Sequence, residues 1–381
     1  MSSLAFYVHI PYCVRRCGYC DFNTYTPGEL SIDLNFRDVS RSYIDLLLQE
    51  INFARQISTA EKVPTIFFGG GTPTLMEPVD LGRVVSAIGE KFDLLPNAEV
   101  TTEANPDTVT QEKLAALRTA GINRISFGMQ SATPHVLDTL DRTHNPENVL
   151  KATQWAREAG FDEISVDLIY GTPGESISDW QRSIDTALSL PITHISAYAL
   201  IVESGTKLGA QVKRGDIVMP DDDETADKYL LADEKFEAAG FRWYELSNWS
   251  KPGSESRHNL AYWNGDNWWG AGPDAHSHID GRRFWNVKHP TAYAQKMANG
   301  GDPKHEEEFL TDSQKASEEI MLKIRLADGL AFDSLTPIQI DTLEGFKSQG
   351  HLIVQSWSEK RAVLTRSGRL IADRIVREIL L

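Results

Sequence analysis

The sequence predicts an α/β protein whose residues 1–204 form an open, partial (β/α)6 barrel. Short apolar segments alternate with amphipathic ones here, in strand–helix units of about 30 residues, which is typical of parallel strands joined by helical crossovers. Six such units are two too few for a closed eight-stranded barrel. Residues suited to a binding site follow directly after each predicted strand.

The predicted strands are short runs rich in apolar and β-branched residues, namely Leu4–Ile10, Thr65–Phe68, Glu99–Thr102, Arg124–Phe127, Glu163–Leu168 and Ile192–Tyr198. Between them, apolar residues recur at helical spacing in five segments, namely Ser42–Ile57, Asp80–Phe92, Gln111–Ala120, Pro146–Ala159 and Ser178–Leu188. Because the carboxyl ends of parallel strands share one face of a barrel, we expect the residues just after the strands to meet in one site.

The rest of the chain divides into an extension, residues 205–305, and a C-terminal domain, residues 306–381. The extension is rich in Trp and Gly and has few periodic segments. In the C-terminal domain the pattern predicts three helices and one β-hairpin, namely Ser313–Ile324, Pro337–Gln349, a hairpin of His351–Trp357 with Ala362–Leu364, and Ser367–Leu380. This order predicts a small winged-helix-like α+β domain.

The composition is that of a globular protein, with 41% hydrophobic residues, 24% charged residues and a net charge of −16. No apolar run approaches the about 18–20 residues that span a bilayer, and the start lacks the basic segment of a signal peptide, so we expect a cytoplasmic protein. No basic stripe is present, and nucleic acid is therefore not an expected partner. The acidic runs are best interpreted as solvated surface.

The three cysteines of the chain, Cys13, Cys17 and Cys20, form the pattern CxxxCxxC. An odd number of cysteines this close together cannot form a disulfide framework, and it is typical of a reducing compartment. One loop with this spacing can place three thiolates on three irons of a [4Fe–4S] cubane and leave the fourth iron without a protein ligand. A structural zinc site with a remote histidine is the alternative, although zinc sites normally pair C-x₂-C knuckles and none recurs here.

With the aromatic Tyr19 just before the last cysteine, this pattern resembles the signature of radical S-adenosylmethionine (SAM) proteins. Four further motifs narrow the likeness: YVHIPYC ending at Cys13, GGGTPT from Gly69, EANP from Glu103 and DLIYG from Asp167. In this order they resemble the oxygen-independent coproporphyrinogen III oxidase family over essentially the whole chain. The resemblance implies a radical SAM barrel with a cluster whose open iron is chelated by the amino and carboxylate groups of SAM.

The resemblance also implies which residues contact SAM. Gly70, Gly71 and Thr72 match the loop beside the SAM amino group, where glycine lets backbone carbonyls approach a ligand closely. The other matching positions are Tyr7, Tyr19, Glu103, Gln130, Arg142, Asp167 and Ala199. The two acids suit a sulfonium and a ribose, and the guanidinium suits a carboxylate, with a surface salt bridge as the alternative for the arginine.

Two departures from the oxidases point to one branch of the family. Phe22 stands where the oxidases have a fourth cysteine, so decarboxylation of coproporphyrinogen is not expected. The sequence HNxxYW, formed by His258, Asn259, Tyr262 and Trp263, resembles the signature of the HemW-type haem chaperone branch. An imidazole can be an axial ligand of haem iron, and the two aromatic rings offer flat surfaces to a porphyrin. A hydrogen-bonded core histidine is the alternative interpretation.

The resemblance therefore implies a haem chaperone of radical SAM fold, which binds haem and delivers it to haem-receiving proteins, with a [4Fe–4S] cluster and SAM as cofactors. The alternative is an oxygen-independent coproporphyrinogen III oxidase, which uses a 5′-deoxyadenosyl radical to decarboxylate propionates. The sequence leaves open whether SAM is cleaved, whether the chain forms a homodimer, and whether it associates transiently with a membrane surface.

Overall fold

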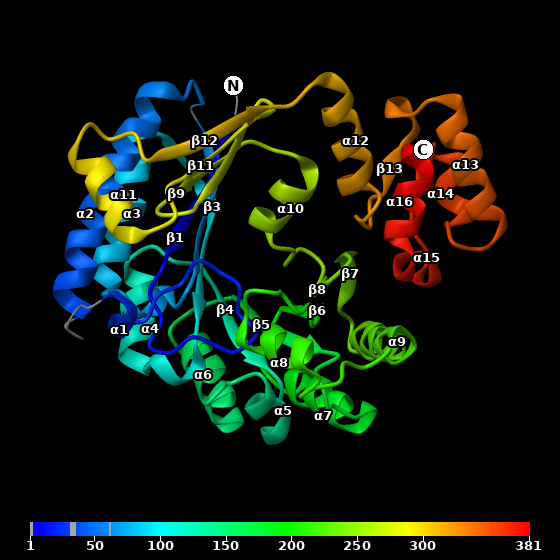
Figure 1. Cartoon of the computed structure of the whole chain (residues 1–381), viewed down its shortest axis with the longest axis horizontal. Coiled ribbons are helices and arrows are strands. Elements are labelled where there is room, and N and C mark those ends of the chain that lie inside the picture. The colour runs from blue at the N-terminus through cyan, green and yellow to red at the C-terminus, as the bar shows by residue number, and fades with distance from the viewer. Residues whose placement is uncertain (1–2, 31–35, 61) are drawn as a thin grey trace.

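The computed structural model describes residues 3–30, 36–60 and 62–381, and within them the fold is built round one mixed sheet (Figure 1). The sheet has twelve strands in the order β12-β11-β10-β9-β1-β2-β3-β4-β5-β6-β8-β7. Its central strands are β1 (Ala5–Ile10), β2 (Lys62–Gly70), β3 (Asp93–Ala104), β4 (Arg124–Gln130), β5 (Glu163–Tyr170) and β6 (His194–Ala199). These six strands pair in parallel and in chain order, which confirms the predicted partial (β/α)6 barrel.

Helices cover the outer face of this sheet. They are α1 (Pro27–Leu30), α2 (Phe36–Ile57), α3 (Pro78–Lys91), α4 (Gln111–Thr119), α5 (Pro134–Thr139), α6 (Pro146–Glu158) and α7 (Ile177–Leu188), with 3₁₀ turns at Pro73–Leu75 and Pro106–Thr108. Local signals set their starts: Ser176 and Asp179 form a capping box at the start of α7, and Asn145 caps α6 just before Pro146. Their apolar faces join the outward-facing strand residues in one continuous core.

The extension adds strands to both edges of the barrel sheet. Its elements are α8 (Lys207–Arg214), α9 (Asp222–Ala238), β7 (Arg242–Glu245), β8 (Asn248–Ser250), α10 (Arg257–Asn264), β9 (Trp268–Ala271), β10 (His276–Ile279), β11 (Arg282–Asn286) and α11 (Pro290–Ala298). β8 pairs with β6 and is antiparallel to it, whereas β9 pairs with β1 in parallel and continues through β10 and β11 to β12 (Lys304–Phe309). Such short strands carry little periodicity, which is why the sequence did not reveal them.

The C-terminal domain has its own core beside β7 (Figure 1). Its elements are α12 (Asp312–Lys323), β13 (Leu330–Ala331), a 3₁₀ turn (Phe332–Ser334), α13 (Pro337–Ser348), α14 (Val354–Ser358), β14 (Arg361–Ala362), α15 (Arg366–Leu370) and α16 (Ala372–Leu380). Two buried arginine contacts attach it to α9: Arg369 donates to both carboxylate oxygens of Asp233, at 2.8 and 2.7 Å. No helix in the described part of the chain is both long and apolar enough to cross a membrane.

The predicted hairpin of His351–Trp357 with Ala362–Leu364 is wrong. These segments share only an isolated bridge between Leu352 and Leu364, because α14 occupies most of the first segment and β14 pairs with β13 instead. An apolar run this short fits a helical turn as well as a strand, and its tertiary neighbours decide between them. The predicted last helix is likewise two helices, α15 and α16, that meet at Ile371.

Candidate functional site

The cysteine loop, residues 11–25, leaves the carboxyl end of β1 and returns to it. The backbone N–H of Tyr25 donates to the Pro11 carbonyl at 2.7 Å, and the N–H of Cys13 donates to the Tyr25 carbonyl at 3.0 Å. The N–H of Cys20 donates to the Cys17 carbonyl at 3.2 Å and tightens the turn between them. All three thiols are free and half-buried. The loop therefore presents the cysteines together at one end of the barrel.

The electrostatics of these thiols fit a metal cluster. Burial raises the pKa of Cys13 to about 11, and it also raises the pKa of Cys20, while the charge of neighbouring thiolates adds to both shifts. A cluster relieves this repulsion because it binds the sulfurs as thiolates. Among the described residues, no three Cys, His, Asp or Glu side chains converge on a single ion. A cubane takes one thiolate on each of three irons, so the donor set fits a [4Fe–4S] cluster better than zinc.

The loop after β2 lies directly against the cysteine loop. A Cβ atom on Gly71 would stand 2.4 Å from the Tyr12 carbonyl oxygen and 3.0 Å from Cys13 Sγ, so only glycine allows this approach. Gly70 has φ +110°, in the region that favours glycine. Thr72 continues the contact, because its N–H donates to Tyr12 O at 2.8 Å. The predicted Gly–Gly–Thr segment is thus held beside the predicted cluster ligands.

Two carboxylates face the barrel interior at the same end. Glu103 accepts a hydrogen bond from the backbone N–H of Gly70 at 3.1 Å, and Asp167 accepts one from Ser126 Oγ at 3.0 Å. Burial, and then the charge of Asp167, raise the pKa of Glu103 to about 8, and burial also raises the pKa of Asp167. Two acids that repel each other in an enclosed space suit a ligand with a positive charge.

Gln130 and Arg142 belong to the same end of the barrel. Gln130 is a buried non-glycine residue with φ +62°, at a register shift between β4 and β5, and such strain is typical of functional sites. Arg142 donates from Nη2 to the Gly128 carbonyl at 2.8 Å, while its Nη1 lies 3.6 Å from Cys17 Sγ. The arginine is therefore a half-buried cation beside the predicted cluster ligands rather than one half of a surface salt bridge.

The other three predicted SAM contacts, Tyr7, Tyr19 and Ala199, are positioned by how they pack within the barrel. Tyr7 faces the interior, and its ring stacks on Phe67 with centroids 6.3 Å apart. Tyr19 packs against the small apolar cluster under the cysteine loop. Ala199 is the last residue of β6 and pairs with Tyr170. The structure thus gathers all the predicted cluster and SAM residues round the carboxyl ends of β1 to β6.

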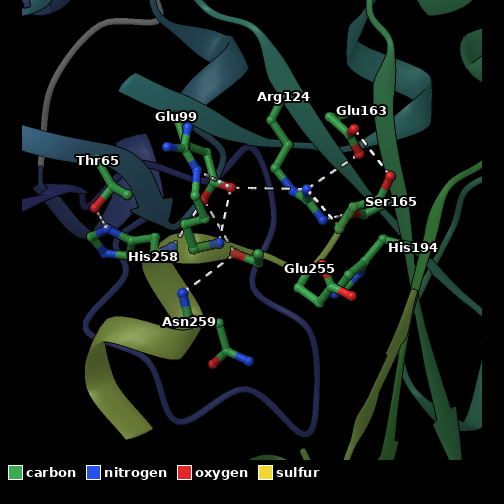
Figure 2. A network of polar contacts seen from close by, with 12 residues as sticks. Thr65, Glu99, Arg124, Glu163, Ser165, His194, Glu255, His258 and Asn259 are labelled. Carbon is green, nitrogen blue, oxygen red and sulfur yellow. Dashed lines mark hydrogen bonds and ion pairs between the residues drawn. The ribbon is translucent and has the colours of Figure 1, made fainter. Parts of the chain in front are cut away.

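The HNxxYW residues lie at the opposite end of the barrel. Figure 2 shows α10 entering a network of side chains from the amino-terminal ends of the strands. Glu99 on β3 accepts hydrogen bonds from the backbone N–H groups of Arg257, at 2.9 Å, and His258, at 3.0 Å, in the first turn of α10. A carboxylate at this position satisfies donors that have no partner inside the helix. Nearby, the buried Arg124 forms an ion pair with Glu163 at 3.4 Å.

His258 has both ring nitrogens in internal hydrogen bonds. Nδ1 lies 2.8 Å from Thr65 Oγ1, and Nε2 lies 3.0 Å from the Tyr262 hydroxyl. The ring stacks on Phe67 with centroids 5.1 Å apart, and only 2% of the residue is exposed. Burial lowers the pKa of His258 to about 3, so the imidazole is neutral. Axial ligation by His258 would require one of these two bonds to break.

Of the other motif residues, Asn259 and Tyr262 belong to the same network as His258, whereas Trp263 does not. Asn259 donates to Glu245 at 3.2 Å and to the Tyr244 hydroxyl at 3.3 Å, which joins α10 to β7. Tyr262 packs edge-on against Trp268, with centroids 4.9 Å apart. Trp263 is half-buried and contributes no hydrogen bond to the network of the described residues. The structure therefore joins three of the four motif residues in one internal network.

A set of hydrogen bonds made by His9 and Asn23, here called the bracket, holds the two ends of the cysteine loop. The sequence did not predict it. His9 donates from Nε2 to the Asn23 carbonyl at 2.9 Å, so its Nδ1 accepts the Tyr7 hydroxyl, also at 2.9 Å. The Asn23 amide in turn donates to the Lys288 carbonyl at 2.8 Å. The extension thereby fixes the far end of the cysteine loop. The available signal was Asn23 itself, because an Asn three residues past the last cysteine suggests a turn.

A buried carboxylate anchors the same bracket. Glu50 on α2 accepts hydrogen bonds from the Tyr293 hydroxyl at 2.6 Å, the Gly272 N–H at 2.8 Å and the Asn286 amide at 2.8 Å. Burial raises its pKa to about 7. Gly272 itself touches the entry to the cysteine loop, since a Cβ there would stand 2.8 Å from His9 O. The sequence offered one signal for this contact, because Glu50 is an acid on the apolar face of the predicted helix Ser42–Ile57.

Comparisons with known proteins agree with this geometry. The model of the radical SAM superfamily matches residues 7–187. A protein of Mycobacterium tuberculosis (strain ATCC 25618 / H37Rv) named "Heme chaperone HemW" is 45% identical over 98% of this chain and 94% of its own. One of Bacillus subtilis (strain 168) with the same name is 34% identical over 97% of both chains. The solved coproporphyrinogen III oxidase HemN of Escherichia coli has the same fold, with a TM-score of 0.82 over 99% of this chain and 90% of its own, at 22% identity.

Proposed function

Since the chain belongs to the radical SAM superfamily and, within it, to the family of the heme chaperone HemW, we propose that it binds haem as cargo and delivers it to haem-receiving proteins. The observation that carries this proposal is the 45% identity with a protein named "Heme chaperone HemW", over nearly the whole of both chains. Phe22 supports a chaperone over an oxidase, because an exposed phenyl ring replaces the fourth cysteine and cannot ligate metal.

The proposal includes a [4Fe–4S] cluster on Cys13, Cys17 and Cys20, with SAM beside it. When bound, the cluster supplies redox-active iron with one open position, and SAM supplies a sulfonium. The Arg142 guanidinium, 3.6 Å from Cys17 Sγ, offsets thiolate charge and holds the loop in place. Whether the chain cleaves SAM is a separate question from whether it carries haem.

The two interior acids would respond to a cationic ligand. Without one, the pKa of Glu103 is about 8, so this carboxyl holds a proton at neutral pH. A positive charge nearby stabilises the carboxylate and lowers the pKa, so the proton leaves when SAM binds. Gly70 N–H, 3.1 Å from Glu103, keeps the carboxylate aimed at the loop that would meet the ligand.

The same proposal places the chain in the cytoplasm with haem-receiving proteins as its partners. Its three thiols would be oxidised to disulfides or higher states in an oxidising compartment before a cluster assembled. A cluster assembled on these thiols therefore favours a reducing location.

The test is a haem transfer assay on the anaerobically reconstituted chain. Haem should bind at about one per chain with a distinct Soret band, and the band should shift to that of the acceptor when an apo-haemoprotein is added. In a parallel arm with coproporphyrinogen III, SAM and a reductant, no decarboxylated porphyrin should form. Robust decarboxylation, or no haem binding at all, would contradict the proposed function.

A further inference from the structure

A face of four aromatic rings lies beside the HNxxYW network. Trp268 on β9 pairs directly with His278 on β10, and His276 on β10 pairs with Trp285 on β11. Residues directly opposite in a sheet share a face, and alternate residues of one strand share a face. These four side chains, here called the histidine–tryptophan face, are therefore on one side of the sheet.

This face belongs to the concave side of the sheet. The residue next to Trp268, Trp269, points the other way, because it is buried against Phe53 and Glu50 of α2. Trp268 therefore faces the barrel interior, where it meets Tyr262 of α10. Trp268 lies on β9, the strand next to β1, and in the paired register Tyr7 lies opposite Gly270, two residues along β9 from Trp268. At about 4.8 Å between strands and about 3.3 Å per residue along them, the face begins about 8 Å from the Tyr7 position.

The rings form a partly open surface, in which the planes of His276 and Trp285 are nearly parallel and those of Trp268 and His278 are 45° apart. His276 stacks on Trp285 with centroids 5.4 Å apart and planes 16° apart, and His278 lies 5.0 Å from Trp268. His276 is exposed and the other three are half-exposed. Gly270 makes this possible, since a Cβ there would stand 2.2 Å from the His276 carbonyl oxygen. Such a surface suits a large planar ligand with an apolar face.

The two histidines keep ring nitrogens free, unlike His258. His278 lies with Nδ1 3.3 Å from the Asp266 carbonyl, which can only accept, so Nδ1 carries the proton and Nε2 keeps its lone pair. A histidine whose other ring N–H binds a backbone carbonyl is oriented as metal-ligating histidines usually are. Within the described residues, neither ring nitrogen of His276 has a hydrogen-bond partner.

We propose that one haem binds on the histidine–tryptophan face, with Nε2 of His278 as the axial ligand and the other three rings against the porphyrin. The inference rests on the proposed function and names its haem site. Glu306 on β12 pairs with Trp285 at one border of the face, so the anionic propionates point away from this carboxylate, whereas Glu308 beside it is paired with Arg283. The HNxxYW network then supports Trp268 through Tyr262 instead of ligating iron.

The experiment is a ferric haem titration of the reconstituted full chain and its variants, followed by absorbance. His278→Ala should weaken binding at least about tenfold and move the Soret band, because the axial nitrogen is lost. Added imidazole should restore the wild-type Soret position in this variant, which a purely structural defect would not allow. Trp285→Leu should weaken binding but keep the Soret position. His258→Gln should keep the Soret position.

The matched control is His135→Ala. This histidine is also exposed, but it lies on α5, outside the sheet. Its loss should change neither affinity nor spectrum. If the wild type binds haem but His278→Ala keeps both its affinity and its Soret position, the site is elsewhere and only this inference fails. If the wild type binds no haem, the proposed function fails as well.

Discussion

The two ends of the barrel differ in how completely the chain satisfies its own polar groups. At the amino-terminal end, Glu99, Arg124 and His258 find partners within the protein, and α10 closes the end. At the carboxyl end, the pKa values of two thiols, Cys13 and Cys20, and of two acids are raised by burial, and Gln130 holds a strained φ. A network in which each side chain has a partner stabilises a fold. Perturbed pKa values and backbone strain, by contrast, are typical of a ligand-binding site.

This difference changes the meaning of the HNxxYW motif. A histidine beside aromatic residues fits a haem ligand and a core residue equally well as a pattern. In the structure, both ring nitrogens of His258 are occupied, whereas His278 on the open sheet has a free Nε2. We therefore interpret the motif as the structural support of a haem-binding face, and not as the source of the iron ligand.

The largest expected effect is at the carboxyl end. Cys17→Ala should abolish the cluster after anaerobic reconstitution, because one loop supplies all three thiolates and the remaining two cannot hold a cubane. Iron and sulfide should fall from about four of each per chain to well below that. The unfolding free energy of the cluster-free protein should hardly change, since the thiol is only half-buried. A Cys17→Ala protein with full iron content would overturn the assignment.

At the amino-terminal end of the barrel, a substitution should lower the stability of the protein and leave its iron content unchanged. Arg124→Met leaves the buried Glu99 and the half-buried Glu163 without their shared cation, so the unfolding free energy should fall by about 3–5 kcal/mol. Urea denaturation at a temperature where the variant is folded measures this loss. Iron content after reconstitution should stay at the wild-type level. The double variant Arg124→Met with Glu163→Gln should recover part of the stability, because one unpaired charge is then removed.

The sequence predicted the carboxyl end better than the rest because that site is built from local signals. A CxxxCxxC loop, a Gly–Gly–Thr turn and a carboxylate after a strand each lie within a few residues, and parallel strands bring them together. The HNxxYW network depends on long-range pairs such as Thr65 with His258, 193 residues apart. No pattern along the chain encodes such a pair, and the burial of His258 follows only once α10 is in place.

An effect of intermediate size is expected from Glu50, which anchors the bracket behind the cysteine loop: it should make the unfolding free energy depend on pH. Burial raises the pKa of Glu50 from 4.5 to about 7, so the folded state binds a proton more tightly than the unfolded state. Stability should therefore fall as pH rises from about 4.5 to 7 and then level off, by about 1–3 kcal/mol. Urea denaturation at pH 5 and pH 8 measures it. Glu50→Gln should show a smaller change, and an equal change in both proteins would rule out Glu50 as its source.

The smallest effect concerns the interior acids and SAM. Glu103, with a pKa of about 8, is mostly protonated at pH 6.5 and mostly ionised at pH 9. A sulfonium attracts only the ionised form, so the affinity of the wild type for SAM should rise by up to about tenfold between these pH values, which corresponds to about 1.4 kcal/mol. Tyr7 and Tyr262, whose charges would also act on this acid, have raised pKa values and stay neutral over this range.

Calorimetry of SAM binding in buffers of different ionisation enthalpy measures both the affinity and the proton released. Glu103→Gln should bind SAM weakly at both pH values and release no proton, because an amide cannot ionise. Glu90→Gln, on an exposed position of α3, is the matched control and should behave as the wild type does. Asp167 also has a raised pKa, from burial, so it is the rival source of the proton. A pH dependence that survives in Glu103→Gln would assign the effect to Asp167 and leave Glu103 as a structural acceptor for Gly70.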